Sequence, residues 1–134
     1  MAKAQSIQVI VVTPETTLLD TTAEFVALPL YDGELGVAPG HAPFIGRLGY
    51  GELRVAQAGG GQSYYVDGGF AQVAGDVVSL LTNYAAPAAQ LDLAAAQRQL
   101  ADITARPAKT DEQIQARLKA QEQARAKIRL AGKR

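Results

Sequence analysis

The sequence predicts an antiparallel β-sandwich or flattened barrel followed by a hairpin of two α-helices. Short runs before Pro87 alternate between apolar and polar residues, and all thirteen glycines but one lie in this part of the chain. Alanine, glutamine, lysine and arginine dominate after Pro87, with almost no β-branched residues. The first pattern is typical of strands and the second of helices. We therefore expect two domains, residues 1–87 and residues 88–134.

Nine short runs in the first domain are candidate strands. The first run contains Ile7, Val9 and Val11 and ends at Thr13-Pro14, since proline cannot donate to a strand ladder. The others are residues 16–20, 23–30, 34–38, 44–48, 52–57, 62–66, 70–74 and 76–82. Turn sequences rich in glycine separate them. No segment between these runs is long enough for a crossover helix, so we expect an antiparallel arrangement.

Two helices are predicted after Pro87. Residues 92–105 place apolar side chains at steps of three and four, with Asp92 as the N-cap. Pro107 cannot continue this helix, so the chain must turn there. A second helix then begins at Thr110, which forms a capping box with Gln113, and runs toward Gly132. Its apolar face is thin and is interrupted by Gln121, so we expect a hairpin that is able to detach or extend.

Composition excludes several classes of function. The 134 residues contain no cysteine and one histidine, His41, which excludes disulfides, thiolate nucleophiles and metal sites built from several cysteines or histidines. No apolar run is long enough to span a membrane, and the first thirty residues lack the pattern of a signal peptide. With 48% hydrophobic residues, the chain has enough apolar surface to bury a core.

The net charge of zero conceals two segments of opposite sign. Residues 1–87 hold eight acidic and three basic side chains, whereas residues 88–134 hold five acidic and ten basic ones. The basic second helix is either an ordinary solvated face or a surface that docks on an acidic protein. Nucleic-acid binding is not expected, because the β domain is acidic and its aromatic residues are expected in core and edge packing. These are Phe25, Tyr31, Phe44, Tyr50, Tyr64, Tyr65 and Phe70.

No pattern in the chain indicates an active site. Gly59-Gly60-Gly61 joins two candidate strands and lacks the lysine and hydroxyl residue of a phosphate loop. His41 lies in a turn, where we expect its imidazole to be satisfied by backbone or by a partner protein. The scattered carboxylates are expected to be solvated.

Three strings together carry a resemblance to a known family. Residues 33–43 read Gly-Glu-Leu-Gly-Val-Ala-Pro-Gly-His-Ala-Pro, residues 48–53 read Leu-Gly-Tyr-Gly-Glu-Leu, and residues 66–73 read Val-Asp-Gly-Gly-Phe-Ala-Gln-Val. In this order and at this spacing, with two helices after them, the chain closely resembles the epsilon subunits of F-type, proton-translocating ATP synthases.

The resemblance implies a ten-stranded β-sandwich and a helical hairpin in a non-catalytic subunit of the central stalk. Its partners would be the gamma subunit, the membrane-embedded c-ring and the beta subunit, and its association with the membrane would be indirect. The implied location is the cytoplasmic face of the bacterial inner membrane, with the chloroplast thylakoid as the alternative. Glu34 and His41 lie in the segment that matches the ring-facing turns of the family.

The resemblance also implies a regulatory role for the hairpin. In the family this tail can extend along gamma and meet an acidic loop of the beta subunit, which hinders ATP hydrolysis. The cations expected to make this contact are Arg117, Arg125, Lys127 and Arg129.

Some relatives bind ATP through the motif Ile/Leu-Asp-x-x-Arg-Ala. This chain keeps Asp92 but has Ala95 at the arginine position, so only Arg98, about one turn further on, could replace the guanidinium. We expect no cofactor and treat ATP as a doubtful regulatory ligand. The alternative to the whole assignment is a free-standing β-sandwich that binds a ligand in a groove and oligomerises through its helices.

Overall fold

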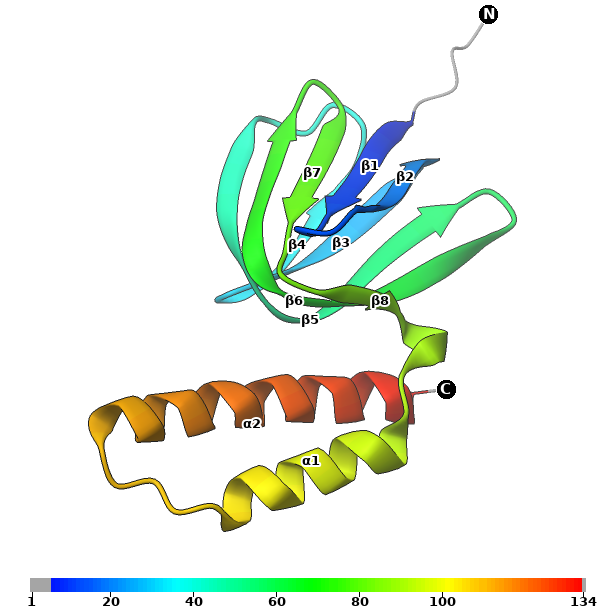
Figure 1. The fold of residues 1–134 in the computed structure, drawn as a ribbon. Helices are drawn as coiled ribbons and strands as arrows, with labels where there is room; N and C mark the ends of the chain where they lie inside the picture. Colours follow the sequence, from blue (N-terminus) through cyan, green and yellow to red (C-terminus); the bar gives the residue numbers. More distant parts are fainter. Residues whose placement is uncertain (1–5, 134) are drawn as a thin grey trace, which may run out of the picture. The chain divides into compact units, whose positions relative to one another are not determined.

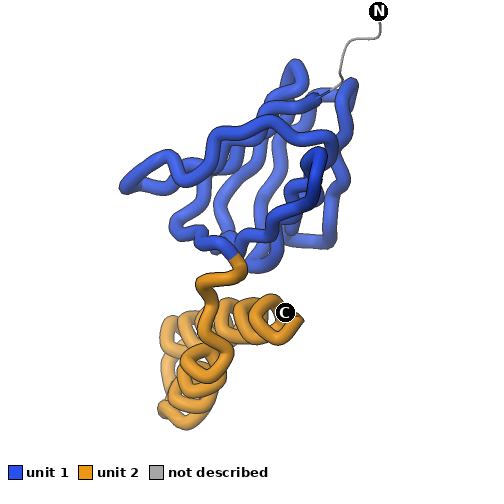
Figure 2. Tube along the Cα trace, turned by 90° about the vertical axis from the view of Figure 1, so that its right-hand side faces the viewer, with its two compact units in different colours: residues 1–87 blue, residues 88–134 orange. Residues whose placement is uncertain are grey.

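The computed structural model describes residues 6–133 and divides the chain after Pro87 into two compact units (Figures 1 and 2). Residues up to Pro87 form a unit of β-strands. Residues from Ala88 onward form a unit of helices. The change of composition at Pro87 thus coincides with a change of structure.

The β unit contains eight strands in the described residues, joined in one sheet. The strands are β1 (Ile7–Val12), β2 (Thr17–Ala23), β3 (Phe25–Leu30), β4 (Gly33–Val37), β5 (Phe44–Gln57), β6 (Gly60–Ala74), β7 (Val77–Leu81) and β8 (Ala85–Pro87). Their order is β2-β1-β7-β6-β5-β3-β4, and β8 pairs with β6 outside this path. The predicted combination of an N-terminal β domain and a C-terminal helical pair is confirmed.

The strand count differs from the nine expected from the sequence and from the ten implied by the resemblance. β5 joins the candidates 44–48 and 52–57, and β6 joins the candidates 62–66 and 70–74. The two strands remain paired on both sides of a glycine-rich bend, where Leu48 lies opposite Gly69 and Tyr50 lies opposite Asp67. β8 was not expected, because three residues are too few to show a period of two.

One pairing contradicts the expected antiparallel arrangement. β1 and β7 run parallel, with Val9 opposite Val78 and Val11 opposite Leu80. A parallel pair normally requires a helical crossover, but here five other strands form the connection between β1 and β7. Intervening strands thus take the place of a crossover helix when the two parallel strands are distant in sequence.

The sheet curls until strands from its two sides meet. The side-chain amide of Gln57 on β5 donates to the hydroxyl of Thr21 at 3.0 Å and to the carbonyl oxygen of Thr22 at 2.8 Å, both on β2. The N–H of Glu24, between β2 and β3, donates to the carbonyl oxygen of Ala56 at 2.8 Å. The curled sheet surrounds one apolar core, whose fully buried members include Ile7, Val9, Val11, Val26, Leu28, Val37, Leu53, Val66, Val78 and Leu80.

A polar cluster lies at the bend of β6. The buried Tyr65 donates its hydroxyl to Asp67 Oδ1 at 2.8 Å, and its ring lies 6.2 Å from that of Tyr84. The N–H of Asp67 is shared by Thr82 Oγ1 and the carbonyl oxygen of Tyr84, at 3.1 and 3.0 Å. Burial, followed by the hydrogen bond to Asp67, raises the pKa of Tyr65 well above its usual value. Among the described residues, no buried side-chain nitrogen or oxygen lacks a partner.

The helical unit consists of a short 3₁₀ turn, η1 (Ala88–Gln90), and the helices α1 (Leu93–Ala105) and α2 (Asp111–Gly132). Both predicted N-caps are confirmed. Asp92 accepts a hydrogen bond from the N–H of Ala95, and Thr110 and Gln113 form the reciprocal capping box.

The seam between α1 and α2 is as thin as predicted. Ala96 is the buried residue of α1, and the buried residues of α2 are three alanines and one leucine, namely Ala124, Ala126, Ala131 and Leu130. Leu118 is 47% exposed, and Leu93 and Ile114 are each 36% exposed. Because these three large side chains remain in partial contact with water and most of the buried residues are alanines, the helices bury less apolar area than a seam of large side chains would.

Candidate functional site

Glu34, the first predicted ring contact, lies at the start of β4 and is exposed. Its carboxylate oxygen Oε1 accepts a hydrogen bond of 2.8 Å from the Arg54 guanidinium on β5, reaching across β3. About half of each side chain is exposed, so this ion pair contributes at most about 1 kcal/mol to stability. Glu34 is therefore already paired within the chain, and a cation from a partner would compete with Arg54.

His41, the second predicted ring contact, lies beyond the other end of β4, in the loop that leads to β5. Its Nδ1 donates to the carbonyl oxygen of Ala42 at 2.7 Å. The loop is tied to the β6–β7 turn, because the N–H of Gly40 donates to Asp76 Oδ1 at 2.8 Å. The structure thus places Glu34 and His41 at opposite ends of β4 and does not bring them together.

The exposed surface of the sheet carries an apolar patch that the sequence analysis missed. Ile45 is 76% exposed, Tyr31 68%, Phe70 61% and Leu81 57%. Phe70 lies directly between Arg47 on β5 and Leu81 on β7, and the Arg47 guanidinium lies 4.6 Å from the centre of the Tyr31 ring. We call these four residues the apolar face: Ile45, Phe70 and Leu81 belong to the neighbouring strands β5, β6 and β7, which Figure 1 labels, and Tyr31 belongs to the β3–β4 turn.

The apolar face corrects the expectation that the aromatic residues are used in core and edge packing. Tyr64 and Tyr65 are buried as expected, but Phe70 and Tyr31 project into solvent. The signal that could have revealed this face is a pair of adjacent large apolar residues within one strand. Such pairs occur at Phe44-Ile45 and Leu80-Leu81. Because successive side chains of a strand point to opposite faces, one member of each pair must point outward.

The four cations predicted to meet the beta subunit do not share one environment. Arg117 is half-buried and donates to the carbonyl oxygen of Arg106 at 3.0 Å, across the hairpin. Lys127 is also half-buried, whereas Arg125 and Arg129 are exposed. In the folded hairpin, Arg125 and Arg129 are therefore the more accessible of the four.

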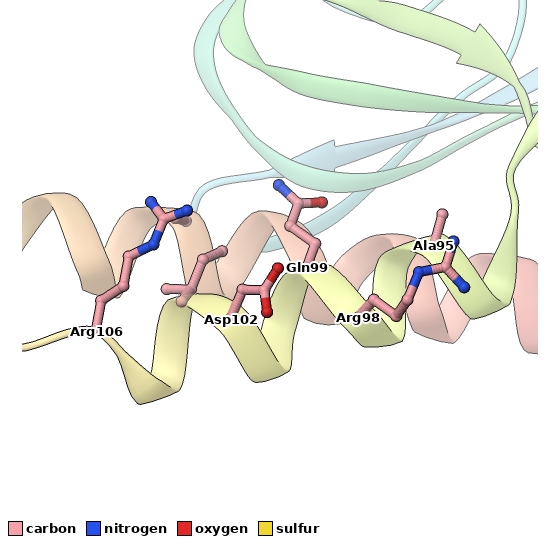
Figure 3. Close-up of a pocket in the computed structure, with 7 residues that line it drawn as sticks. Ala95, Arg98, Gln99, Asp102 and Arg106 are labelled. Atoms are coloured by element: carbon pink, nitrogen blue, oxygen red, sulfur yellow. The ribbon is translucent and has the colours of Figure 1, made fainter.

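Asp92 and Arg98, the two residues considered for nucleotide binding, have different roles in the structure. Asp92 is occupied as the N-cap of α1. Arg98 lines a cavity of about 440 Å³ in the helical unit, together with Gln99, Asp102 and Arg106 of the same segment. Arg98 and Arg106 stand on either side of Asp102 (Figure 3). The methyl group of Ala95, where the family motif has arginine, also lines this cavity.

The described residues do not assemble a recognisable catalytic or metal centre. Residues 6–133 contain no cluster of three or more histidine, aspartate and glutamate side chains placed to hold a metal ion. In the same part of the chain, neither α1 nor α2 is apolar enough over a sufficient length to cross a bilayer. The prominent features are surfaces, namely the apolar face, the two turns that flank β4 and the basic hairpin.

Comparison with known proteins identifies relatives over nearly the whole chain. Residues 6–88 match the family model of the ATP synthase delta/epsilon chain β-sandwich domain. The chain is 52% identical over 124 residues to the ATP synthase epsilon chain of Rhodopirellula baltica, covering 92% of this chain and 97% of that one.

The fold is also similar to chains of two solved assemblies. One is in the cryo-EM structure of the Euglena gracilis mitochondrial ATP synthase containing OSCP, F1 and the c-ring. It has a TM-score of 0.85 and 22% identity, covering 100% of this chain and 85% of that one. The other is in the central stalk and c-ring of the Tetrahymena thermophila mitochondrial ATP synthase. It has a TM-score of 0.74 and 13% identity, covering 97% and 99% of the two chains. The sequence match spans most of both proteins and the fold agrees with it, so the chain belongs to the family of ATP synthase epsilon chains, the non-catalytic subunits of the central stalk.

Proposed function

We propose that this central-stalk subunit binds the gamma subunit through the apolar face, touches the c-ring through the turns at the two ends of β4, and restrains ATP hydrolysis through its helical hairpin. In this role it passes rotation between subunits by protein contacts and carries out no chemistry itself. Family membership places the chain in the central stalk and c-ring assembly. It also argues against the alternative of a free-standing binding module.

The apolar face is the observation that carries this proposal. Three large exposed side chains lie on the adjoining strands β5, β6 and β7, and the exposed Tyr31 joins them through Arg47; an exposed apolar patch of this kind is typical of a protein interface. Arg47 and Tyr31 are residue types enriched at interfaces. A permanent neighbour in the stalk would remove this surface from water, and gamma is the stalk subunit implied by the resemblance.

Contact with the c-ring is proposed for Glu34 and His41 on electrostatic grounds. Glu34 already accepts one guanidinium, so a basic side chain of a ring loop fits the same carboxylate. Complementary charges of this kind fix register more than they add affinity. The His41 backbone N–H donates to the carbonyl oxygen of Ala38, and the neighbouring Gly40 N–H donates to Asp76, so the loop has a defined shape before any partner arrives.

Contact with the beta subunit is proposed for Arg117, Arg125, Lys127 and Arg129 on the basic second helix. An acidic loop would attract these cations, and added salt would weaken the contact. Nucleotide binding would be a separate input to the hairpin. It would have to use Arg98 and Arg106 without a guanidinium at position 95, and calorimetry of the isolated chain with ATP measures it.

The proposed location is the cytoplasmic face of a bacterial inner membrane, where the other subunits hold the chain. The bacterial source of the 52% identical relative favours this location over a thylakoid.

Replacement of Phe70 by aspartate tests the proposed gamma contact. Burying a phenylalanine side chain contributes about 2 kcal/mol, so Phe70→Asp is expected to weaken binding to purified gamma by at least about 30-fold. Ala58→Asp is the matched control, since Ala58 is exposed in the β5–β6 turn and lies outside the apolar face. Urea unfolding confirms that both variants fold. Equal binding by Phe70→Asp and the parent chain, or an equal loss in Ala58→Asp, would contradict the proposal.

A further inference from the structure

Two side-chain hydrogen bonds connect the last turn of α1 with the first half of α2. Arg117 Nη1 donates to the carbonyl oxygen of Arg106 at 3.0 Å, and Gln121 Nε2 donates to Thr104 Oγ1 at 3.3 Å. Arg117 and Gln121 are four residues apart on α2 and therefore share one helix face. We propose that these two bonds form a polar clasp that holds the hairpin closed, and that Arg117 reaches an acidic partner only after the clasp opens.

The chemistry at the end of α1 favours a guanidinium. Arg106 is the C-cap and has an extended backbone (φ −75°, ψ 139°), so the chain leaves the helix just before Pro107. The final carbonyl groups of a helix lack partners within the helix and carry the negative end of its dipole. Arg117 supplies a permanently charged donor to a carbonyl at this end.

The clasp matters because the apolar seam is weak. α1 has one buried residue, Ala96, the buried residues of α2 are three alanines and Leu130, and the large side chains Leu93, Ile114 and Leu118 are partly exposed. When apolar burial is small, a charge-assisted hydrogen bond is a considerable part of the energy that distinguishes the closed from the open hairpin.

Arg117 therefore differs from Arg125, although both are cations of the same helix. In the closed hairpin Arg117 is half-buried and its Nη1 is used by the Arg106 carbonyl oxygen, so a bidentate bond through both Nη groups to a carboxylate of another protein requires the clasp bond to break. Arg125 is exposed in the closed hairpin, so its loss removes a charge without removing a clasp bond. The clasp forms within the isolated chain and needs no partner. Its effect on ATP hydrolysis by the assembled complex rests on the proposed function.

The clasp is tested by measuring the opening of the hairpin in the full chain. The sequence has no cysteine, so Ala101→Cys on α1 and Gln115→Cys on α2 provide two unique sites for spin labels at exposed positions. Pulsed electron resonance then gives the distribution of distances between the helices. Arg117→Ala is expected to raise the ratio of open to closed hairpins roughly fivefold, and Arg125→Ala to leave it unchanged. Thr104→Val removes an acceptor of the clasp while keeping every cation, and it is expected to raise the ratio about twofold.

The outcomes separate the clasp from the proposed inhibition. An unchanged distance distribution in both Arg117→Ala and Thr104→Val overturns the clasp, as does equal opening in Arg125→Ala. ATP hydrolysis by the assembled complex is then compared for the parent and Thr104→Val. If Thr104→Val opens the hairpin and hydrolysis falls, both proposals stand. If the hairpin opens and hydrolysis is unchanged, the clasp stands and the inhibitory function fails.

Discussion

Glycine is required at position 69, where β6 passes close to the backbone of β7, because there is no room for a Cβ atom. The residue has φ +105°, and a Cβ added there would lie 1.9 Å from the carbonyl oxygen of Leu81. This neighbour is backbone and cannot rotate away. We expect Gly69→Ala to lower the free energy of unfolding by roughly 3 kcal/mol or more, measured by urea titration.

Gly59→Ala is the matched control for this prediction. Gly59 also has a positive φ, +87°, but no atom lies within 4 Å of its added Cβ. The free energy of unfolding of Gly59→Ala should therefore fall only by the conformational cost of a positive φ, about 1 kcal/mol. Equal losses in the two variants would show that backbone conformation, and not the contact with Leu81, determines the need for glycine at position 69.

Tyr65 makes the stability of the β unit sensitive to alkaline pH. Burial, reinforced by Asp67, raises the pKa of its phenol above the ordinary value of 10.0. Between pH 10 and this raised pKa, the unfolded chain gives up the phenol proton and the folded chain keeps it. The free energy of unfolding therefore falls as the pH rises above 10.

Tyr65→Phe should lower the free energy of unfolding by about 1 kcal/mol at pH 8, because Asp67 loses a hydrogen-bond donor. Between pH 8 and pH 11, the free energy of unfolding of this variant should fall less than that of the parent chain. Urea unfolding at the two pH values measures both effects. A parent chain whose stability does not change above pH 10 would contradict the assignment of a raised pKa.

At the scale of elements, the strands and the helices are stabilised in different ways. β5 and β6 pair along almost their whole length and enclose a core of fully buried side chains. α1 and α2 meet along a seam with few buried side chains and are supplemented by side-chain hydrogen bonds. Helices of this length are marginal without packing, so the hairpin should open more often than the sheet.

Hydrogen exchange checks this difference directly. In the isolated chain we expect amides of residues 93–130 to exchange at least about tenfold faster than the slowest amides of β1, β6 and β7. Equal protection in the two units would show that the hairpin does not open independently, and it would also remove the basis for an extended state.

At the scale of the whole molecule, the two units carry opposite charge. Eight acidic and three basic residues precede Ala88, and five acidic and ten basic residues follow Pro87. The acidic unit bears the apolar face and the proposed ring contacts, and the basic unit bears the proposed contacts with the beta subunit. Assembly and inhibition should therefore be separable.

A chain that ends at Pro87 should still assemble with gamma and the c-ring, because the described core of the β unit consists of residues before Ala88. Removing residues 88–134 should raise ATP hydrolysis by the assembled complex. The measurement compares hydrolysis at equal amounts of assembled complex. Unchanged hydrolysis would mean that this subunit does not inhibit, and failed assembly would mean that the helices take part in docking.

Local chemistry let the sequence predict the helices closely. Asp92 and Thr110 are caps because their side chains bond to backbone groups three residues away, and Pro107 ends α1 through its own ring. The motif that contains Glu34 and His41 is also contiguous, so it could be recognised without knowledge of the fold.

The sequence by itself determined the boundary at Pro87, the helix ends and the family, because each depends on residues that are close together in the chain. Only the tertiary structure decided the parallel pairing of β1 with β7, the exposure of Phe70 and the pairing of Glu34 with Arg54. It also distinguished Arg117 from Arg125, which the sequence presents as two similar cations of one helix. These features depend on residues brought together from distant parts of the chain, and local pattern carries no information about which distant strand or helix will become the neighbour.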